Sequence, residues 1–594
     1  MKKFIIPLIG IALLASACSQ ERLDIEQKGV VSTESFYNGS DESCQSAVTA
    51  MYDKAISTTG NWRIYVPLNY LFSCPGDDMY SGGGSYGDCD YAAELSEFRV
   101  QVNNDVLTNF YGESYQIIYT ANLVTDNFPE PKNAYQKDLV AQARAMRAIY
   151  HMYLALAVGT PPIVDHVLAG SDKPENSESQ AAVLKWAAEE LESAANDLTE
   201  RASTADKALT YRISKGAALA FAGRCRLYMK DYSGAKTDLE KVINSGKYDL
   251  LPSERFHELW EVEGDGSAEK IFEYNIDENT AIATWGSGIT AQIVHSTWMA
   301  ASSVNWRFDH MAGTPSIMFT TGWGFSNPTG KYGDALIDND GIDSYRRKAF
   351  IRTYAEVLGL AGSELNIPGE EGCEDCNLHY ADEPTTYAGK LADPNRGSNT
   401  AAGMFDIEGG KHSAGYFNWK TIALQKDMRQ GLWDDRNYHL MRYAEVLLMY
   451  AECCVQTNSD LAKGLEALNK IQKRAGSNHI SSSLTLQEVK NEKFLELFNE
   501  GCRWNDLVRW GDAEKEYANM RTEGGKTLGT GDYQPYLRDR MFTDGAATHQ
   551  GYTYIDYDKG NTVKHGYQTG RNELFPFPFS ATSVNTNLVQ NPGY

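Results

Sequence analysis

The chain has 594 residues, of which 42% are hydrophobic and 23% charged, as in an ordinary globular protein with ample material for a large core. Its net charge of −24 repels phosphate backbones, which excludes nucleic acid as a principal partner. Aromatic residues are plentiful, with 35 Tyr, 21 Phe and 11 Trp, and they suit both core packing and flat apolar faces for a ligand.

The first 17 residues, MKKFIIPLIGIALLASA, predict an export signal. Two lysines precede an apolar run that is too short to span a bilayer, and small residues then lead to Cys18. This order is typical of a lipoprotein signal, so we expect Cys18 to become the acylated N-terminus that anchors the chain to a membrane. Ordinary secretion with cleavage nearby is the alternative. Residues 18–594 are expected to form a single body.

Apolar residues recur with helical spacing through the first part of this body, about 34–250. The patterns predict helices over 34–56, 107–125, 135–158 and 180–199, followed by a helical hairpin over 212–246. In the hairpin, Gly223 and Ala235 are small residues that allow two helices to approach closely, as in tetratricopeptide repeats.

Residues 70–92 interrupt the helices with a loop of glycines, carboxylates and aromatics. Asp77 and Asp78 can accept hydrogen bonds from sugar hydroxyls, and Tyr80 or Tyr86 offers a stacking face. A solvated loop with acidic turn residues is the alternative interpretation. No GK[ST] follows the glycines, and the acidic neighbours oppose an anion, so the loop is not predicted to bind phosphate.

Residues 252–435 are predicted to form a loop-rich region, with one strand at 269–277. Several tryptophans stand there in irregular, Gly- and Ser-rich chain, where they have less reason to be core residues. An indole can stack on the C–H face of a sugar while polar neighbours bond its hydroxyls. The candidates are Trp298, Trp306, Trp323 and its neighbour Phe325, with core packing as the alternative for each.

No metal or other cofactor is predicted. Cys373 and Cys376 form a lone CxxC pair, which is expected to be a local disulfide or two free thiols, because zinc sites need a second pair. The run DNDGID at 338–343 hints at calcium, but its Gly stands fourth where an EF-hand needs it sixth, so a structural calcium ion is unsupported.

The helical signal returns over 436–511 as three successive patterns. The first two are predicted to pair antiparallel, and the second is expected to end at Gly476. The third is predicted to be one helix with its apolar face on Phe494, Leu497, Phe498, Gly501 and Trp504. Cys453, Cys454 and Cys502 lie on these helices as packing residues. The tail 512–594 has little helical signal, and its final run is expected to be extended and to pack on the body.

Four motifs in this order resemble the SusD/RagB family of outer-membrane nutrient-binding lipoproteins: RYAEVLLMYAE, ALNKIQKRAG, LELFNEGCRWNDLVRWG and the terminal LFPFP…NPGY. Segments 143–164 and 217–252 match as well, so the resemblance covers nearly the whole mature chain. It implies a mainly α fold in which tetratricopeptide-like hairpins, an α-α superhelix, support a loop-rich ligand-binding region with minor β structure. It also implies lipid anchoring at the outer membrane, on the cell surface, and a SusC-like TonB-dependent transporter as partner.

The same resemblance favours particular binding residues. The loop with Asp77 and Asp78 is similar to a loop that often lines the family's ligand site, and TTGWGFSNP, which holds Trp323, matches the place of a binding loop. Tyr416, Trp419 and Lys420 resemble a second wall of that site.

The sequence carries no HExxH motif, no zinc quartet and no convincing catalytic set, so no enzyme is predicted. We expect the protein to capture an oligosaccharide or polysaccharide, break no bond, and pass it to the transporter. Three alternatives stay open: a peptide or other nutrient as ligand, a glycoside hydrolase whose two carboxylates are distant in sequence, and a scaffold that only binds proteins.

Overall fold

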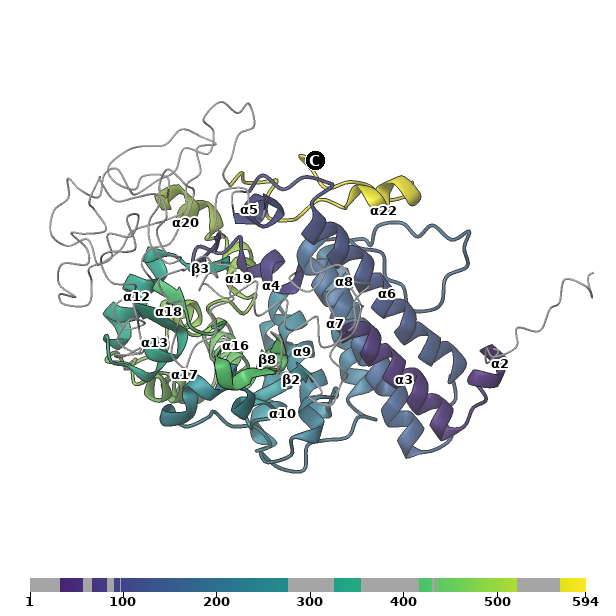
Figure 1. Cartoon of the computed structure of the whole chain (residues 1–594), viewed down its shortest axis with the longest axis horizontal. Coiled ribbons are helices and arrows are strands. Elements are labelled where there is room, and N and C mark those ends of the chain that lie inside the picture. The colour runs from purple at the N-terminus through teal and green to yellow at the C-terminus, as the bar shows by residue number, and fades with distance from the viewer. Residues whose placement is uncertain are drawn as a thin grey trace, which may run out of the picture.

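The computed structural model describes residues 33–56, 67–82, 90–96, 98–275, 325–353, 416–422, 424–429, 433–434, 436–520 and 567–594. Within these ranges helices dominate and the strands form only two-stranded pairs, which confirms the mainly α fold (Figure 1). None of the helices there has the length and apolarity that a membrane span requires.

The helices predicted in the first part of the body are present. They are α6 (Asp105–Asn127), α7 (Ala134–Val158) and α8 (Gln180–Ala194), while the helix predicted over 34–56 is divided into α2 (Thr33–Phe36) and α3 (Asp41–Ile56). Two short helices, α4 (Pro67–Ser73) and α5 (Asp90–Ser96), were not predicted and overlap the ends of the segment 70–92 that was expected to be a loop. The longer ones begin at polar caps, because Asn104, Asn133 and Ser179 each accept a hydrogen bond from the amide three residues on.

The predicted hairpin consists of α9 (Lys215–Tyr228) and α10 (Tyr232–Asn244). Gly223 does permit a close approach, but its partner is Leu239: a Cβ at Gly223 would lie 2.7 Å from the Leu239 side chain. Ala235, the expected partner, is buried.

The second helical group contains α16 (Tyr443–Gln456), α17 (Leu461–Ala475), α18 (Leu486–Glu496), α19 (Arg503–Trp510) and α20 (Ala513–Met520). The helix α17 ends at Gly476 in the left-handed conformation, as predicted. The prediction of a single third helix was wrong. The segment is divided into α18 and α19, because Asn499 and Gly501 between them have φ of 55° and 71°. The helix α20 lies in the tail, where helical signal is low.

Successive helices pack side by side around one hydrophobic core, from α6 through α7, α8, α9 and α10 to α16 and α17. In Figure 1 this series runs from α6 and α7 on the right, past α9 and α10, to α16 and α17 on the left. Each helix buries its apolar face on its neighbours in sequence, which is how helical repeats build a superhelix.

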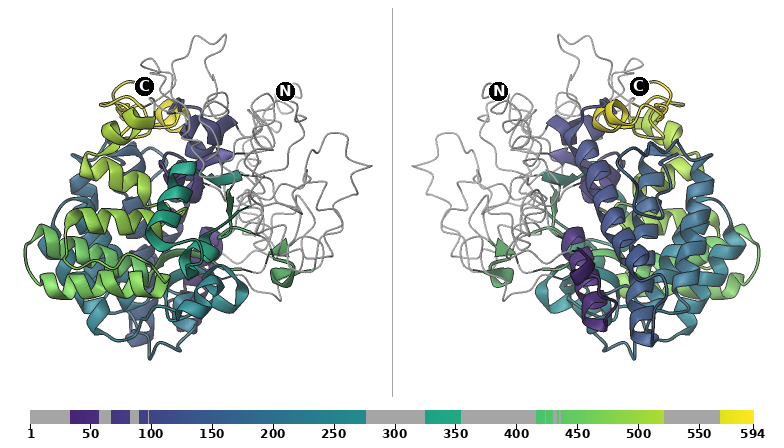
Figure 2. Two further views of the ribbon diagram at one scale, coloured as in Figure 1. Left: turned by 90° about the vertical axis from the view of Figure 1, so that its left-hand side faces the viewer. Right: turned by 90° about the vertical axis from the view of Figure 1, so that its right-hand side faces the viewer.

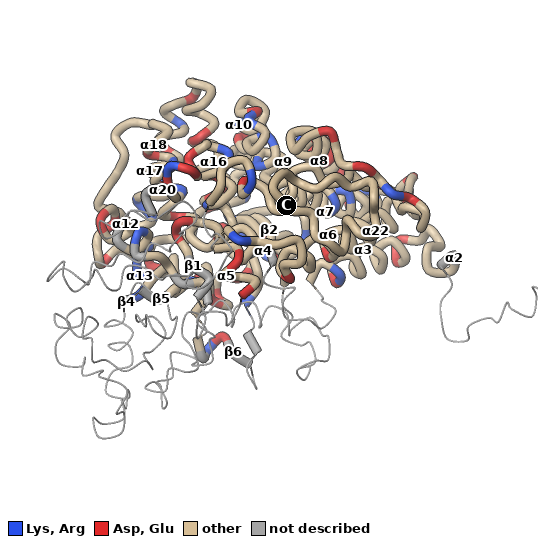
Figure 3. The backbone as a smooth tube through the Cα atoms, turned by 90° about the horizontal axis from the view of Figure 1, so that it is seen from above, with Lys and Arg blue, Asp and Glu red and all other residues tan. Residues whose placement is uncertain are grey.

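The strands pair antiparallel: β1 (Met79–Gly82) with β3 (Phe325–Pro328), β2 (Lys270–Tyr274) with β8 (Tyr438–Arg442), β4 (Ile351–Thr353) with β5 (Tyr416–Asn418), and β6 (Met428–Arg429) with β7 (Trp433–Asp434). The strand predicted at 269–277 is thus confirmed as β2. Figure 3 shows β1, β4 and β5 along one side of the body and α8, α10 and α16 along the opposite side.

The region predicted to be irregular also contains helices, α12 (Gly330–Asp340) and α13 (Tyr345–Phe350), and the 3₁₀ segments Ser253–Trp260, Val262–Gly264 and Gln425–Asp427. A further 3₁₀ turn, Ala208–Thr210, precedes α9. Gly330-Lys331-Tyr332 form the first turn of α12, and Thr329 caps this helix because its side chain accepts a hydrogen bond from the Tyr332 amide.

The C-terminal segment lies across the top of the body beside α5 and α6 (Figures 1 and 2). It packs on the body as predicted, since Phe575 and Phe577 are buried and the Phe575 amide donates to the Ala157 carbonyl at 2.8 Å. It is not wholly extended, because Phe579–Val584 form the short helix α22.

Candidate ligand-binding face

Three of the segments predicted to bind ligand meet at one place. Strand β1 pairs with β3, β4 pairs with β5, and β3 lies in contact with β5. The Asn418 side-chain amide joins the last two by donating to the Ser326 carbonyl at 2.9 Å. We call β1, β3, β4 and β5 the strand cluster. It brings together chain positions that are hundreds of residues apart.

The register places the predicted residues within this cluster. Tyr80 stands opposite Asn327, Phe325 opposite Gly82, and Tyr416 opposite Thr353. On β1 and β3, these positions alternate with Met79, Ser326 and Pro328, which are buried in the body. Four other predicted binding residues lie outside the described residues, namely Tyr86, Trp298, Trp306 and Trp323, and so do Cys18, Cys373 and Cys376.

Asp77 was predicted to offer its carboxylate to a ligand, but the structure does not allow this. It is fully buried, and its oxygens accept hydrogen bonds from Arg503 Nε at 2.5 Å, Arg503 Nη2 at 2.9 Å and Lys331 Nζ at 2.5 Å. Burial by itself raises the pKa of this carboxyl, but Arg503 and Lys331 outweigh that effect and hold it well below its usual range. Asp77 is therefore an ionised structural residue.

Asp78 was also predicted to bond a ligand hydroxyl, but it is buried, at 1% exposure, and cannot do so in this arrangement. Its Oδ1 has no hydrogen-bond partner among the described residues and would lie 2.3 Å from a Cβ at position 76, which explains why Gly76 precedes the two aspartates. Burial, with the neighbouring Asp77 carboxylate, raises the pKa of Asp78 to about 7.

Trp419 is not an open stacking platform, because its side chain is buried at 8% exposure. Its ring has the Arg352 guanidinium 5.4 Å from the centroid, and its amide donates to the Phe350 carbonyl at 2.8 Å. The predicted wall residue instead ties the end of β5 to the end of α13.

The next residue, Lys420, anchors β5 more deeply. Its ammonium donates to the Phe498 carbonyl at 2.8 Å and to Glu500 Oε1 at 2.7 Å, and it lies 3.6 Å from the centre of the Phe350 ring. Burial lowers the pKa of Lys420 to about 8, although Glu500 acts in the opposite direction. The strand is thus fixed to the loop between α18 and α19.

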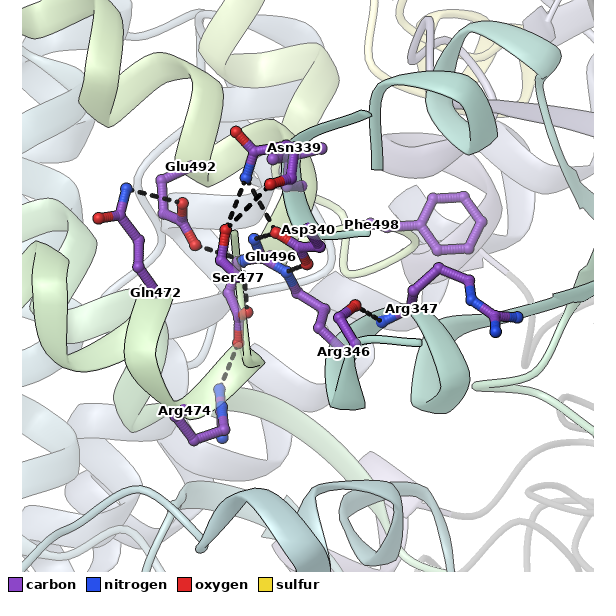
Figure 4. A network of polar contacts seen from close by, with 12 residues as sticks. Asn339, Asp340, Arg346, Arg347, Gln472, Arg474, Ser477, Glu492, Glu496 and Phe498 are labelled. Atoms are coloured by element: carbon purple, nitrogen blue, oxygen red, sulfur yellow. Dashed lines mark hydrogen bonds and ion pairs between the residues drawn. The ribbon is translucent and has the colours of Figure 1, made fainter. Parts of the chain in front are cut away.

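A network of buried charges fixes α13, and with it β4, to the helical scaffold (Figure 4). Arg346 bonds Asp340 through two hydrogen bonds of 2.7 and 2.8 Å, Glu496 at 3.0 Å, and also Glu492. Arg474 donates to Glu496 from α17 at 2.5 Å. The carboxylate of Asp340, in the run that hints at calcium, is therefore held by a guanidinium. No group of three or more potential metal ligands is found within the described ranges.

Sequence reasoning did not identify Lys331 or Arg503 as supports of this face, and it predicted Lys420 as part of the ligand-site wall and not as a buried anchor. Arg503 belongs to the motif NEGCRWND, which predicts a helix and contributes to the family resemblance but indicates no role for this arginine. A basic residue on an apolar helical face is a signal for a buried ionic partner, since buried charges need pairing, but sequence cannot name that partner.

Comparison with known proteins decides the family. The sequence profile of the SusD family matches residues 261–594, more than half of the chain. The chain belongs to the SusD family. This confirms the resemblance found in the four motifs.

Relatives agree with the SusD assignment along nearly the whole chain. A SusD-like protein P2 of Formosa agariphila is 24% identical over 86% of this chain and 91% of its own length. A SusD-like protein of Bacteroides ovatus is 23% identical over 89% of this chain and 86% of its own length.

Solved structures show the same fold. A laminarin-binding SusD-like protein has a TM-score of 0.65 at 22% identity, covering 93% of this chain and 99% of its own. Surface glycan-binding protein A of Bacteroides thetaiotaomicron, in complex with laminarihexaose, has a TM-score of 0.66 at 21% identity, with the same coverage of 93% and 99%.

Proposed function

We propose that this SusD-family protein captures an oligosaccharide or polysaccharide at the cell surface, is held to the outer membrane by lipid on Cys18, and passes its ligand to a TonB-dependent transporter. The observation that carries the proposal is the convergence of β1, β3 and β5, because three separately predicted binding segments meet in one cluster. The names of the similar structures, which bind laminarin or laminarihexaose, support a glucan as the first ligand to try.

The proposed mechanism is capture without bond cleavage. Ring faces at positions 80, 325 and 416 would stack on sugar C–H faces, each contributing about 1 kcal/mol beyond area burial. A short oligosaccharide would then bind with a Kd of roughly mM to µM, about −4 to −8 kcal/mol, and a polymer that spans several sites would bind more tightly.

The first experiment is affinity electrophoresis of residues 19–594 in gels that contain laminarin or plant, microbial or mucin polysaccharides. Retardation by one class, without release of reducing ends, supports the proposal. Release of reducing ends indicates a glycoside hydrolase, and no retardation in any gel shifts the proposal to a peptide ligand.

Aromatic variants then locate the site. Tyr80→Ala and Phe325→Ala are expected to weaken retardation about 10-fold, since loss of one stacked ring removes ~1–2 kcal/mol including area burial. Tyr119→Ala is the matched control, because Tyr119 is an exposed aromatic on α6, at 49% exposure. Equal retardation of all three variants and the parent would remove the strand cluster as the site.

A further inference from the structure

Strands β1 and β3 are tied together at their base, just before β1 and just after β3. The Thr329 amide donates to the Asp78 carbonyl at 2.9 Å, and the Thr329 hydroxyl donates to the Asp77 carbonyl at 2.9 Å. The two strands therefore continue their contact beyond the register pairs, and the contact ends where α12 begins.

Charged side chains reinforce the same point. Asp77 receives Lys331 from the first turn of α12 and Arg503 from the first turn of α19, and Lys331 also bonds Glu516 of α20 at 2.6 Å. Arg503 and Lys331 both lie over the Phe494 ring of α18, at 4.5 and 5.7 Å from its centroid. One buried carboxylate thus joins the base of β1 to the helices around it.

We propose that Asp77, Lys331 and Arg503, which we call the ribbon clamp, are positioning residues that set where β1 and β3 present the ligand-binding positions. Asp77 itself touches no ligand, because it is buried and its oxygens are bonded within the protein. The inference rests on the proposed function only in taking β1 and β3 as ligand-binding strands.

The two-stranded ribbon of β1 and β3 needs such support for a physical reason. An isolated two-stranded ribbon is marginally stable in water, and β1 and β3 have only four residues each. A slip of one residue would exchange the two faces, so positions 80 and 325 would take the places of the buried Met79 and Ser326. Asp77 of the clamp lies three residues before Tyr80, so the clamp fixes the register at the point where such a slip would start.

The test with the smallest perturbation compares Lys331→Met with Lys490→Met. Both lysines are ion-paired and partly buried, with side-chain exposures of 24% and 17%. Each also lies over an aromatic ring, but Lys490 bonds Asp512 and makes no contact with Asp77 in the described structure. Amide hydrogen exchange in peptides that cover 79–82 and 325–328 is expected to quicken about 10-fold in Lys331→Met and to stay within about 2-fold of the parent in Lys490→Met.

A stronger pair of variants removes a buried carboxylate charge. Asp77→Asn loses its pairing to Arg503 on α19, and the matched control Glu452→Gln loses an equally buried pairing to Arg509 on the same helix. Both are expected to lower the Tm, but only Asp77→Asn is expected to weaken retardation in laminarin gels, or in whichever polysaccharide gel retards the parent, by about 10-fold.

Equal exchange in the two lysine variants, or equal loss of retardation in the two carboxylate variants, would overturn the clamp. If Asp77→Asn does not fold, the lysine pair decides. If no polysaccharide retards the parent, the proposed function fails while hydrogen exchange still tests the clamp, so the two failures are distinguishable.

Discussion

In the helical scaffold, Glu496 is surrounded by Arg346, Arg442 and Arg474, whereas at the base of β1 both Arg503 and Lys331 pair with Asp77 and not with the adjacent Asp78. The carboxylates of Glu496, Asp77 and Asp78 are all buried, so desolvation opposes the charge of each one. What differs is the number of cations per carboxylate.

The consequence is visible in the pKa values. Burial raises the pKa of Glu496, but the three arginines outweigh it and lower the value to about 2. The pKa of Asp78 is instead raised to about 7 by the same burial, with Asp77 adding to the rise. The three arginines thus hold Glu496 ionised, while the base of β1 contains one carboxylate, that of Asp78, which titrates near neutral pH.

The largest effect is expected from breaking the scaffold network. Arg346→Met leaves Asp340 and Glu492 buried without their cation, and we expect the free energy of unfolding to fall by about 3–5 kcal/mol. Urea denaturation measures it. Arg255→Met is the control, because Arg255 is 55% exposed and pairs with Glu258 on the surface, where a much smaller loss is expected. Similar losses in both variants would contradict the contrast.

Asp78→Asn tests the other side of the comparison. The folded pKa of Asp78 lies above its ordinary value, so its stabilising contribution is present at low pH and is lost as pH rises from about 4 to about 7. The variant does not suffer that loss, so its stability relative to the parent should rise between pH 5 and pH 8. The free energy of unfolding should gain at most a few kcal/mol, and the Tm should rise with it.

Asp77→Asn is the internal control for this experiment. The pKa of Asp77 is lowered, so its contribution is present above pH 4 and is lost only on acidification; at pH 8 the substitution should therefore destabilise. Its Tm relative to the parent should therefore be lower by about the same amount at pH 5 and pH 8. Thermal unfolding at both pH values checks this, and a rise between pH 5 and pH 8 in Asp77→Asn equal to that in Asp78→Asn would contradict the assignment.

A smaller effect is expected from the helix packing of the scaffold. Gly223→Ala places a methyl group 2.7 Å from Leu239, so α9 and α10 must separate or Leu239 must move, at a cost of about 1–3 kcal/mol. Chemical denaturation measures the loss. A neutral result would mean that the hairpin interface yields more readily than its burial indicates.

The smallest effect has the opposite sign. Gly112 lies inside α6, and a Cβ there meets nothing within 4 Å. Gly112→Ala should therefore stabilise the protein by about 0.5–1 kcal/mol through helix propensity alone. Together with Gly223→Ala, it separates the cost of packing from the intrinsic preference of the backbone, and thermal unfolding of the two variants side by side measures the difference.

Much of the scaffold was predictable because the information is local. Helical periodicity located α3, α6, α7, α8 and the hairpin α9–α10, and Gly476 marked the end of α17. The division between α18 and α19 was missed because the apolar period continues across it: Leu497, Phe498 and Trp504 are all buried on either side of the break. Side-chain pattern gives no warning there, since the backbone turns at Asn499 and Gly501.

The sequence by itself determined the family, the mainly helical fold and the segments from which the strand cluster is built, because motifs and periodicity are read along the chain. Tertiary structure alone decided what the polar residues of those segments do. Asp77 lies 254 residues from Lys331 and 426 from Arg503, so its apparent exposure in a polar loop became burial in an ion cluster only when the chain folded. A buried charge is stable only beside partners that folding supplies, and no local pattern records how far away they stand.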